Sequence, residues 1–381
     1  MSCICIFSAL YLPNMGGVER FTDSLAAELA AEGHSVIVVT NNTHGLSNRE
    51  VLDNGIEVIR LPCKSFIDGR YPVPIKNSCY RRLIADLESR HVDGVLVNTR
   101  FYLHSLIGVR FAEKKGLRAV ILDHGSAYLT LGSKPLDWVI ERYEDGITAW
   151  LKRRDVDFYG ISKKSAEWLG HFGIEAKGVI SNAIDAEAYR AQASGRRFRK
   201  ELGAEDGLLV SFVGRLIPEK GIDALLEIMG YLQDRSVHLV VAGDGPLFGQ
   251  VDTSPLPNVH AVGRLNSSDT AALLIDSDLF CLPTRSEGFS TSLLEAAACG
   301  TVSLVPDVGG AREVAPDASF GFVTNGVNIK EYSDILRRAS DGEFDLKAMG
   351  LRCQAHIEKL LSWTDVARSV IDACKSNSTY N

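Results

Sequence analysis

Two glutamates, Glu287 and Glu295, stand eight positions apart in the stretch SEGFSTSLLEAAACG, residues 286–300. Eight residues exceed two helical turns, so the two carboxylates do not stack as an i, i+4 pair. Ser290 and Thr291 lie between them and are typical helix N-caps. The pattern predicts one carboxylate in a loop and one in the first turns of a helix. Such carboxylates can accept hydrogen bonds from polyol hydroxyls, although an incidental acidic pair around a capped helix is the simpler alternative.

Two cations occur together in VGRLIPEKG, residues 213–221, directly after an apolar run. Arg215 and Lys220 would follow the carboxyl end of a strand and precede a helix that starts at Gly221. Two cations in such a loop can converge on a diphosphate. An ordinary solvated loop between strand and helix is the alternative.

A glycine pair, Gly16 and Gly17, follows the first apolar run in LPNMGGVER and opens a helix expected from about Val18. Glycines at this point let backbone N–H groups approach an anion at a positive helix N-terminus. The spacing is not the GxGxxG fingerprint, so a plain tight turn remains open.

A histidine, His124, ends another apolar run in AVILDHG. At the carboxyl end of a strand, its side chain can donate to a hydroxyl or to a developing charge. A lone histidine is more often structural. A second glycine pair in DVGGAREV, residues 307–314, is expected to shape the edge of the same cleft as Glu287.

The elements that must position these residues are short apolar runs alternating with amphipathic helices such as residues 18–33. The runs are CICIFS, SVIVVT, IEVIRL, DGVLVN, AVILDH, LLVSFVG, HLVVAGD, LFCLPT and VSLVP. Continuous apolar strands separated by helices indicate parallel sheets covered on both faces, which is the α/β class.

A polar, basic segment without strand pattern, residues 185–207, interrupts this alternation. We expect the domain boundary there, with doubly wound α/β domains at 1–185 and 186–363. Ligands of such sheets bind at the carboxyl ends of the strands, so two facing domains would share a cleft.

Length and composition agree with two soluble domains: 381 residues, 45% of them hydrophobic and 23% charged. The net charge of −7 belongs to the second half, which argues against nucleic acid as a partner. Eight cysteines without a CxxC motif indicate reduced thiols and no metal cluster. Without a signal peptide or spanning segment, a cytoplasmic location is expected, with contact to a membrane surface left open.

Together these segments resemble the retaining glycosyltransferases of family 4, which have the GT-B fold of two Rossmann-like domains facing across a cleft. The matching elements are GGVER, DHG, SNAID, VGRLIPEKG, AGDGP, SEGFSTSLLEAAACG and PDVGGAREV, in the order of the family and across nearly the whole chain. The Glu, seven residues, Glu motif is central. SNAID departs from the family in having Ala183 where glycine is usual.

The resemblance implies transfer of a sugar from a nucleotide-diphosphate sugar, with retention at the anomeric carbon and without a required metal or other cofactor. Arg215 and Lys220 would hold the diphosphate, Glu295 the ribose and Glu287 the sugar, while His124 would lie by the sugar and the acceptor. The residues that it assigns to catalysis are His124, Glu287, Arg215 and Lys220. Those that it assigns to the donor are Gly16, Gly17, Arg215, Lys220, Gly263, Arg264, Leu265, Glu287, Gly288, Phe289, Ser290, Thr291 and Glu295.

The resemblance also implies a glycan or lipid-linked acceptor on the N-terminal domain, and a last helix, about 364–381, that returns to that domain. Family frequency favours a UDP-sugar donor. The leading hypothesis is an active transferase in cell-envelope or capsular polysaccharide biosynthesis. Basic clusters around residues 80–82, 114–118 and 152–154 could contact the anionic inner membrane surface, or could be ordinary solvated helix ends. The alternatives are a nucleotide-sugar 2-epimerase and an inactive nucleotide-sugar-binding partner subunit.

Overall fold

The structure is a computed structural model that describes residues 1–66, 69–130, 133–233 and 236–375. The chain forms two compact units. Unit 1 holds Met1–Asn182 together with the helix that begins at Trp363, and unit 2 holds Ala183–Ser362. Each unit is a doubly wound α/β layer structure, which confirms the predicted fold class.

Unit 1 is built on an eight-stranded sheet, as far as its residues are described, with the order β10-β9-β8-β7-β1-β2-β4-β3. Its strands are β1 (Cys3–Ser8), β2 (Ser35–Asn41), β3 (Arg49–Val51), β4 (Glu57–Leu61), β7 (Gly94–Asn98), β8 (Ala119–Asp123), β9 (Val156–Gly160) and β10 (Gly178–Val179). All pairs are parallel except β3 with β4. Strand order reverses between β1 and β7, which is where doubly wound sheets bind ligands.

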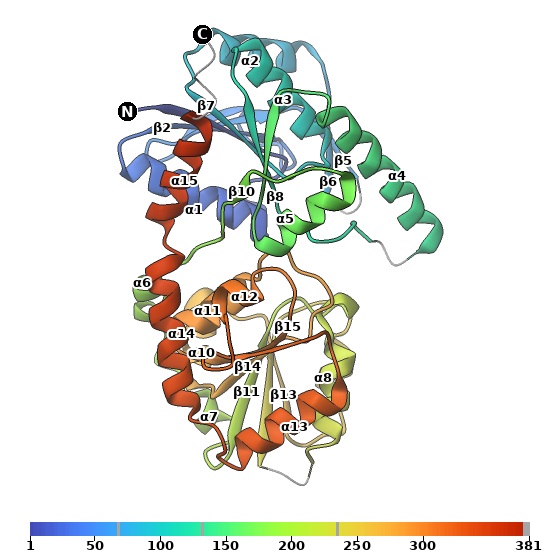
Figure 1. Ribbon diagram of the computed structural model, residues 1–381, viewed down its shortest axis with the longest axis vertical. Helices are drawn as coiled ribbons and strands as arrows, with labels where there is room; N and C mark the ends of the chain where they lie inside the picture. The colour runs from blue at the N-terminus through green and yellow to red at the C-terminus, as the bar shows by residue number, and fades with distance from the viewer. Residues whose placement is uncertain (67–68, 131–132, 234–235, 376–381) are drawn as a thin grey trace. The chain divides into compact units, whose positions relative to one another are not determined.

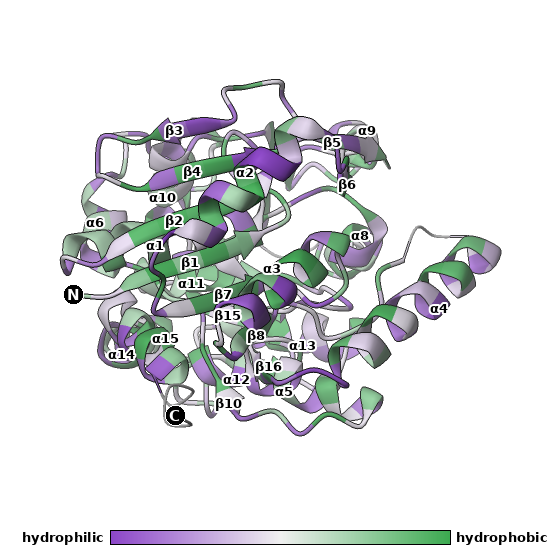
Figure 2. Ribbon diagram, turned by 90° about the horizontal axis from the view of Figure 1, so that it is seen from above, coloured by the Kyte–Doolittle hydropathy of each residue, from purple (hydrophilic) through white to green (hydrophobic). Residues whose placement is uncertain are grey.

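Helices cover the two faces of this sheet (Figure 1). They are α1 (Gly17–Ala31), α2 (Ser78–Ser89), α3 (Leu103–Lys114), α4 (Lys134–Leu151), α5 (Lys163–Leu169) and the 3-10 turn η1 (Gly170–Phe172). A separate antiparallel pair consists of β5 (Cys63–Phe66) and β6 (Tyr71–Pro74). Figure 2 shows strands β1, β2 and β4 as largely hydrophobic, as expected for strands buried on both faces.

The last helix, α15 (Trp363–Lys375), packs in unit 1 beside α1, although the chain reaches it from unit 2 (Figure 1). The Trp363 and Phe21 rings lie 5.6 Å apart, and the Thr364 hydroxyl donates to Glu28 at 2.7 Å. Further along, Cys374 fills the space above Gly94, where an added Cβ would lie only 2.6 Å from the Cys374 Cβ. The C-terminal helix is therefore part of the core of unit 1.

Unit 2 contains a parallel six-stranded sheet, within the described residues, in the order β13-β12-β11-β14-β15-β16. The strands are β11 (Leu208–Val213), β12 (Val237–Ala242), β13 (Val259–Gly263), β14 (Leu279–Cys281), β15 (Val302–Pro306) and β16 (Phe322–Thr324). The order reverses between β11 and β14. The sheet therefore has its own switch point, formed by the loops after these two strands.

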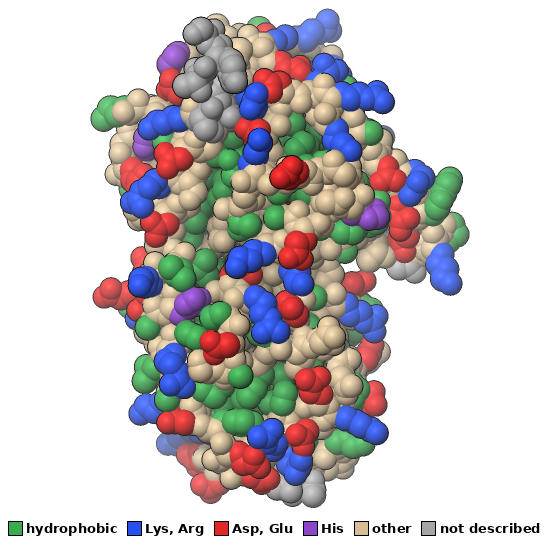
Figure 3. Space-filling view, viewed as in Figure 1, with side chains coloured by type: hydrophobic (Ala, Val, Ile, Leu, Met, Phe, Trp, Pro, Cys, Tyr) green, Lys and Arg blue, Asp and Glu red, His purple; other side chains and the backbone are tan. Residues whose placement is uncertain are grey.

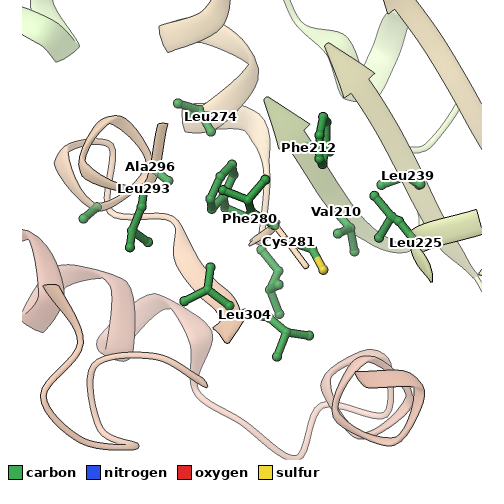
Figure 4. Close-up of a cluster of buried hydrophobic side chains, with 14 of the residues drawn as sticks. Val210, Phe212, Leu225, Leu239, Leu274, Phe280, Cys281, Leu293, Ala296 and Leu304 are labelled. Atoms are coloured by element: carbon green, nitrogen blue, oxygen red, sulfur yellow. The ribbon is translucent and has the colours of Figure 1, made fainter. Parts of the chain in front are cut away.

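The helical elements of unit 2 are α6 (Ala186–Ala191), α7 (Phe198–Glu201), η2 (Pro218–Lys220), α8 (Ile222–Gly230), α9 (Phe248–Asp252), α10 (Ser267–Asp276), α11 (Thr291–Ala298), α12 (Ala311–Val314), α13 (Ile329–Ser340) and α14 (Leu346–Leu360). Figure 4 shows part of the core that they form with the sheet. Phe280 of β14 lies there with Leu293 of α11 and Leu274 of α10, and all three are at most 2% exposed. Packing of α11 on β14 fixes the segment that carries the two glutamates.

Charged side chains of both signs are interspersed on the face of the molecule shown in Figure 3. All eight cysteines are unpaired, and Cys5, Cys281, Cys353 and Cys374 are buried. No helix in the described parts of the chain is long and apolar enough to cross a membrane.

Candidate functional site

The switch point of unit 2 brings together two loops whose sequences predicted function, the one after β11 and the one after β14. The amide of Arg285 donates to the carbonyl of Glu219 at 2.9 Å, and the Thr284 hydroxyl donates to the same carbonyl at 3.1 Å. These hydrogen bonds tie the β14 loop to the η2 turn. The hydrogen bonds therefore hold the charged residues of the two loops close to one another.

The closeness of these loops depends on Gly221, which lies between η2 and α8 with φ +75°. A Cβ at Gly221 would lie 2.0 Å from the carbonyl oxygen of Pro283, much closer than atoms can approach. A second close approach occurs at Gly310, where an added Cβ would lie 2.4 Å from the Phe289 ring. Glycine thus lets the loop after β11 and the loop after β15 close in on the segment around Glu287.

Lys220 and Glu287 form a direct ion pair between Nζ and Oε1. Their side chains are only 18% and 13% exposed. The two residues that the resemblance assigned to the diphosphate and to the sugar therefore contact each other. Because the pair is largely shielded from water, its mutual attraction is stronger than that of a surface pair.

Arg215 lies in the same loop as Lys220 but is exposed. Among the described residues no ion pair of its guanidinium is found, so it can meet an incoming anion without losing a protein partner.

Glu295 lies within α11 and is half-buried. Gly263, with φ +69°, ends β13, and Arg264 and Leu265 follow it. All strand pairs of the unit 2 sheet are parallel, so residues 263–265, at the end of β13, lie at the same edge of the sheet as the loop after β11 that carries Lys220.

The start of α11 is capped as the sequence predicted. The Ser290 hydroxyl accepts a hydrogen bond from the amide of Leu293 at 3.4 Å, and Thr291 is the first helical residue. Glu287 and Gly288 precede the cap in the loop, and Glu295 follows it in the helix. The helix N-terminus therefore lies between the two carboxylates in the chain.

In unit 1, Gly16 and Gly17 open α1, with Gly16 as the N-cap. The Glu19 carboxylate folds back over Gly16: an added Cβ there would lie 2.4 Å from Oε2. Burial raises the pKa of Glu19, and hydrogen bonds from the backbone amides of Gly16 and Glu19 oppose that shift. A carboxylate of the protein thus already sits at this helix N-terminus, as in a capping box.

The sequence carries a signal for this arrangement. Glu19 stands three residues after the N-cap position, which is the capping-box spacing. One amide of the Gly16–Gly17 turn is therefore used within the protein, and an anion would meet those that remain.

His124 follows β8 and is held on two sides. Its Nε2 lies 3.1 Å from Asn98 Oδ1, and its ring meets the Phe21 ring edge-on at 5.0 Å between centroids. Burial lowers its pKa to about 3, so the imidazole is neutral at physiological pH. His104, by comparison, is a core residue whose Nε2 bonds the Val39 carbonyl at 2.9 Å.

A buried charge network that the sequence did not reveal lies next to His124. The Arg100 side chain, 1% exposed, pairs with Asp123 at 3.2 Å and with Glu144 at 3.1 Å. It also stacks over the Phe172 ring at 4.0 Å. Burial raises the pKa of Asp123, while Arg100 and the backbone amide of His124 oppose this shift. The network fixes the backbone at Asp123 and thereby the backbone of the adjacent residue, His124.

The basic clusters of unit 1 divide into two kinds. Arg118 is tied to Asp155 at 2.6 Å, and Arg154 stacks over Trp150 at 4.3 Å, so both have structural partners. Other basic side chains line a pocket of about 310 Å³ between α2 and α3, together with apolar side chains. It is lined by Lys76, Tyr80, Arg81, Ile84, Ala85, Glu88, Ile107, Arg110, Phe111 and Lys114.

Comparison with known proteins identifies both parts of the chain. Residues 15–188 match the family described as Glycosyltransferase Family 4, and residues 195–352 match the family described as Glycosyl transferases group 1. One relative is the GPI3 subunit of phosphatidylinositol N-acetylglucosaminyltransferase from Saccharomyces cerevisiae. It is 24% identical over 381 residues, covering 97% of this chain and 82% of the relative.

A second relative is the GDP-mannose-dependent alpha-(1-6)-phosphatidylinositol dimannoside mannosyltransferase of Mycobacterium tuberculosis. It is 25% identical over 310 residues, covering 80% of this chain and 79% of the relative. Among solved structures, HepE from Anabaena in complex with UDP superposes with a TM-score of 0.73. The match has 18% identity and covers 99% of this chain and 100% of HepE. Matched in both parts, the chain belongs to the glycosyltransferases of family 4, with the GT-B fold.

Proposed function

We propose that this protein transfers a sugar from a nucleotide-diphosphate sugar to a glycan or lipid-linked acceptor, with retention at the anomeric carbon. The observation that carries the proposal is the Lys220–Glu287 pair at the switch point of unit 2, beside the exposed Arg215. A diphosphate entering there would meet two cations. The diphosphate would replace Glu287 as the partner of Lys220. The carboxylate of Glu287 could then accept hydrogen bonds from hydroxyl groups of the sugar.

The leaving diphosphate gains negative charge as the bond to the sugar breaks. We propose that Arg215, Lys220 and the N-terminus of α11 stabilise that charge, as preorganised cations and backbone dipoles do in other transferases. The leaving phosphate takes the proton of the acceptor hydroxyl in this scheme, so no enzymic nucleophile is required. We propose that Glu295 binds the ribose and that the backbone of Gly263–Leu265 contacts the base. In unit 1, Gly17 would serve the donor phosphates, and His124 the sugar and the acceptor.

The donor base is proposed to be uracil. HepE, which has this fold, was solved with UDP, whereas the mycobacterial relative is named as GDP-mannose-dependent. Thermal-shift measurements with UDP-, GDP- and ADP-sugars decide between these bases, because a specific ligand stabilises the folded state, by about 2.7 kcal/mol at a concentration of 100 Kd.

The acceptor is proposed to belong to the cell envelope or to a capsular polysaccharide, and to be reached at the cytoplasmic face of a membrane. The names of the yeast and mycobacterial relatives both contain phosphatidylinositol. The pocket between α2 and α3 has four cations, one carboxylate and an apolar floor, which suits an anionic membrane surface.

The experiment that tests this function follows the donor sugar by NMR during turnover with the preferred nucleotide sugar. We expect release of the nucleoside diphosphate and a product or hydrolysed sugar that first appears with the donor's anomeric configuration, with and without EDTA. Inversion, or loss of turnover with EDTA, would contradict the retaining, metal-independent scheme. A free epimerised sugar would indicate a 2-epimerase, and binding without turnover would indicate an inactive partner subunit.

A further inference from the structure

The hydrogen bonds around His124 identify which ring nitrogen carries its proton. The contact of Nε2 with Asn98 Oδ1 at 3.1 Å does not decide this alone, because a neutral imidazole nitrogen either donates or accepts. The partners of Asn98 do decide it.

The amide group of Asn98 is oriented by Thr22 of α1. Asn98 Nδ2 lies 2.8 Å from Thr22 Oγ1, and Thr22 Oγ1 lies 2.7 Å from the carbonyl oxygen of Val18. A carbonyl oxygen only accepts, so the single hydroxyl proton of Thr22 points to Val18. Thr22 Oγ1 must therefore accept from Asn98, which places the NH₂ group of Asn98 toward Thr22.

A second possible acceptor for Thr22 leads to the same result. Ser8 Oγ lies 3.3 Å from Thr22 Oγ1, and the Ser8 hydroxyl donates its own proton to the Leu10 carbonyl at 2.8 Å. Whichever of the two groups receives the Thr22 proton, Thr22 has no proton left to donate to Asn98. The orientation of the Asn98 amide follows from either arrangement.

The carbonyl oxygen of Asn98 then faces His124, and Nε2 of the ring must donate to it. The Asn98 side chain is 1% exposed and Phe21 packs edge-on against the ring, so the arrangement is shielded from water. The ring is neutral, and the hydrogen bond at Nε2 is its only one within the described part of the chain. Nδ1 therefore carries the lone pair.

We propose that Asn98 is a positioning residue that holds His124 in the Nε2–H tautomer, so that Nδ1 accepts a hydrogen bond from a substrate hydroxyl. The identity of that hydroxyl, on the sugar or on the acceptor, rests on the proposed function. His124 then delivers no proton to the leaving group. This role differs from the expectation that His124 donates to a hydroxyl or to a developing charge. It also links the tautomer to α1, the helix that Gly16 and Gly17 open.

The direct test is the ¹⁵N NMR spectrum of the full chain labelled with [¹⁵N]histidine. Long-range ¹H–¹⁵N correlations distinguish the two neutral tautomers, and His124→Gln identifies the signals of His124 among the nine histidines. We expect Nε2–H in the wild type and in Thr22→Ser, which keeps the hydroxyl. Asn98→Ala and Thr22→Val should show a mixture or the Nδ1–H form. A wild-type ring in the Nδ1–H form, or an unchanged tautomer in both variants, would overturn the proposal.

Turnover supplies the second readout. Asn98→Ala should lower kcat at least tenfold and change the donor KM less than threefold, and Thr22→Val should follow it while Thr22→Ser stays near wild type. Asn41→Ala removes another buried amide of unit 1, which donates to the Ala9 carbonyl at 2.7 Å, and serves as the stability control. An altered tautomer with unchanged kcat would refute the positioning role.

The two failures remain distinguishable. If no nucleotide sugar is turned over, the proposed function fails, but the NMR result still stands on the protein alone. If Asn98→Ala does not fold, the Thr22→Val and Thr22→Ser pair carries the same comparison.

Discussion

The Lys220–Glu287 pair is the feature of single residues on which the proposed chemistry depends most. Both charges are largely withdrawn from water, and each restores part of the hydration that the other has lost. Replacing Glu287 removes the ion-pair partner of the Lys220 ammonium group. A bound diphosphate, in contrast, could replace Glu287 as the partner of Lys220.

Replacement of Glu287 should therefore affect stability as well as turnover. Glu287→Ala is expected to lower the free energy of unfolding by about 1–3 kcal/mol, and Glu287→Gln, which keeps an acceptor, by less. Urea unfolding measures this. Asp334→Ala breaks the exposed Arg337–Asp334 pair in α13, and should change stability by less than about 0.5 kcal/mol. Equal effects of Glu287→Ala and Asp334→Ala would show that the Lys220–Glu287 pair is not shielded as described.

His104 provides a pH-dependent test of the core of unit 1. Burial lowers its pKa from 6.5 to about 4. Below pH 6.5 the unfolded chain therefore binds a proton at His104, whereas the folded chain does not. The stability from neutral His104 is thus complete above pH 6.5 and is lost as the pH falls towards 4. Between pH 6.5 and 5 the loss should approach about 1.4 kcal/mol per pH unit. Unfolding of wild type and His104→Gln across this range isolates the effect, and parallel pH curves would refute it.

The sequence predicts that Arg215, Lys220 and Glu287 follow the carboxyl ends of strands, and the structure places them after β11 and β14. Their role in binding the donor stays a prediction. Their direct pairing was not predictable, since the sequence does not show how far Gly221 lets the loops approach. Arg100 was missed for a different reason. Its partners Asp123 and Glu144 are distant in sequence, and no local spacing marks a buried ion network.

At the scale of elements, the contact between Gly221 and Pro283 holds the two switch-point loops of unit 2 together. Gly221→Ala forces a Cβ into the Pro283 carbonyl at a residue with positive φ. We expect a loss of roughly 1–3 kcal/mol in stability from the backbone strain, together with weaker donor binding because Lys220 moves. The same urea unfolding and donor titrations measure both.

Gly249 provides the matched glycine control for this substitution. It lies in α9, where an added Cβ meets no atom within 4 Å. Gly249→Ala should be neutral or stabilise by up to about 1 kcal/mol, because alanine favours a helix. If Gly221→Ala were as well tolerated as Gly249→Ala, the loops would not depend on their close approach.

The regular elements were largely predictable because their apolar runs are long and uninterrupted. Strands β1, β2, β4, β7, β8, β11, β12, β14 and β15 correspond to the nine runs. Strands β9 and β13 were missed, since polar residues and glycine interrupt the apolar residues of VDFYG and VHAVG and leave no continuous apolar run. The edge strands β3, β10 and β16 are two or three residues long, too short for a periodic signal.

At the scale of the whole molecule, unit 1 is completed by a helix that follows unit 2 in the chain. Val370 of α15 is fully buried in it. Val370→Ala should lower the stability of unit 1 by about 1–3 kcal/mol, whereas Asp372→Ala, on the exposed face of the same helix, should have almost no effect. Hydrogen exchange of β1 and β7 amides, which report on unit 1, measures the change. Unaltered exchange in Val370→Ala would mean that α15 does not stabilise the sheet.

Sugar transfer as proposed requires that unit 2 binds a nucleoside diphosphate through Lys220, and calorimetric titration with UDP, GDP and ADP measures this binding. We predict that one of the three binds the wild type. Lys220→Ala should weaken that binding at least about tenfold, or 1.4 kcal/mol, while Lys347→Ala on the exposed first turn of α14 leaves it unchanged. Absence of binding by all three at millimolar concentration, or equal affinity of Lys220→Ala and wild type, would contradict the claim.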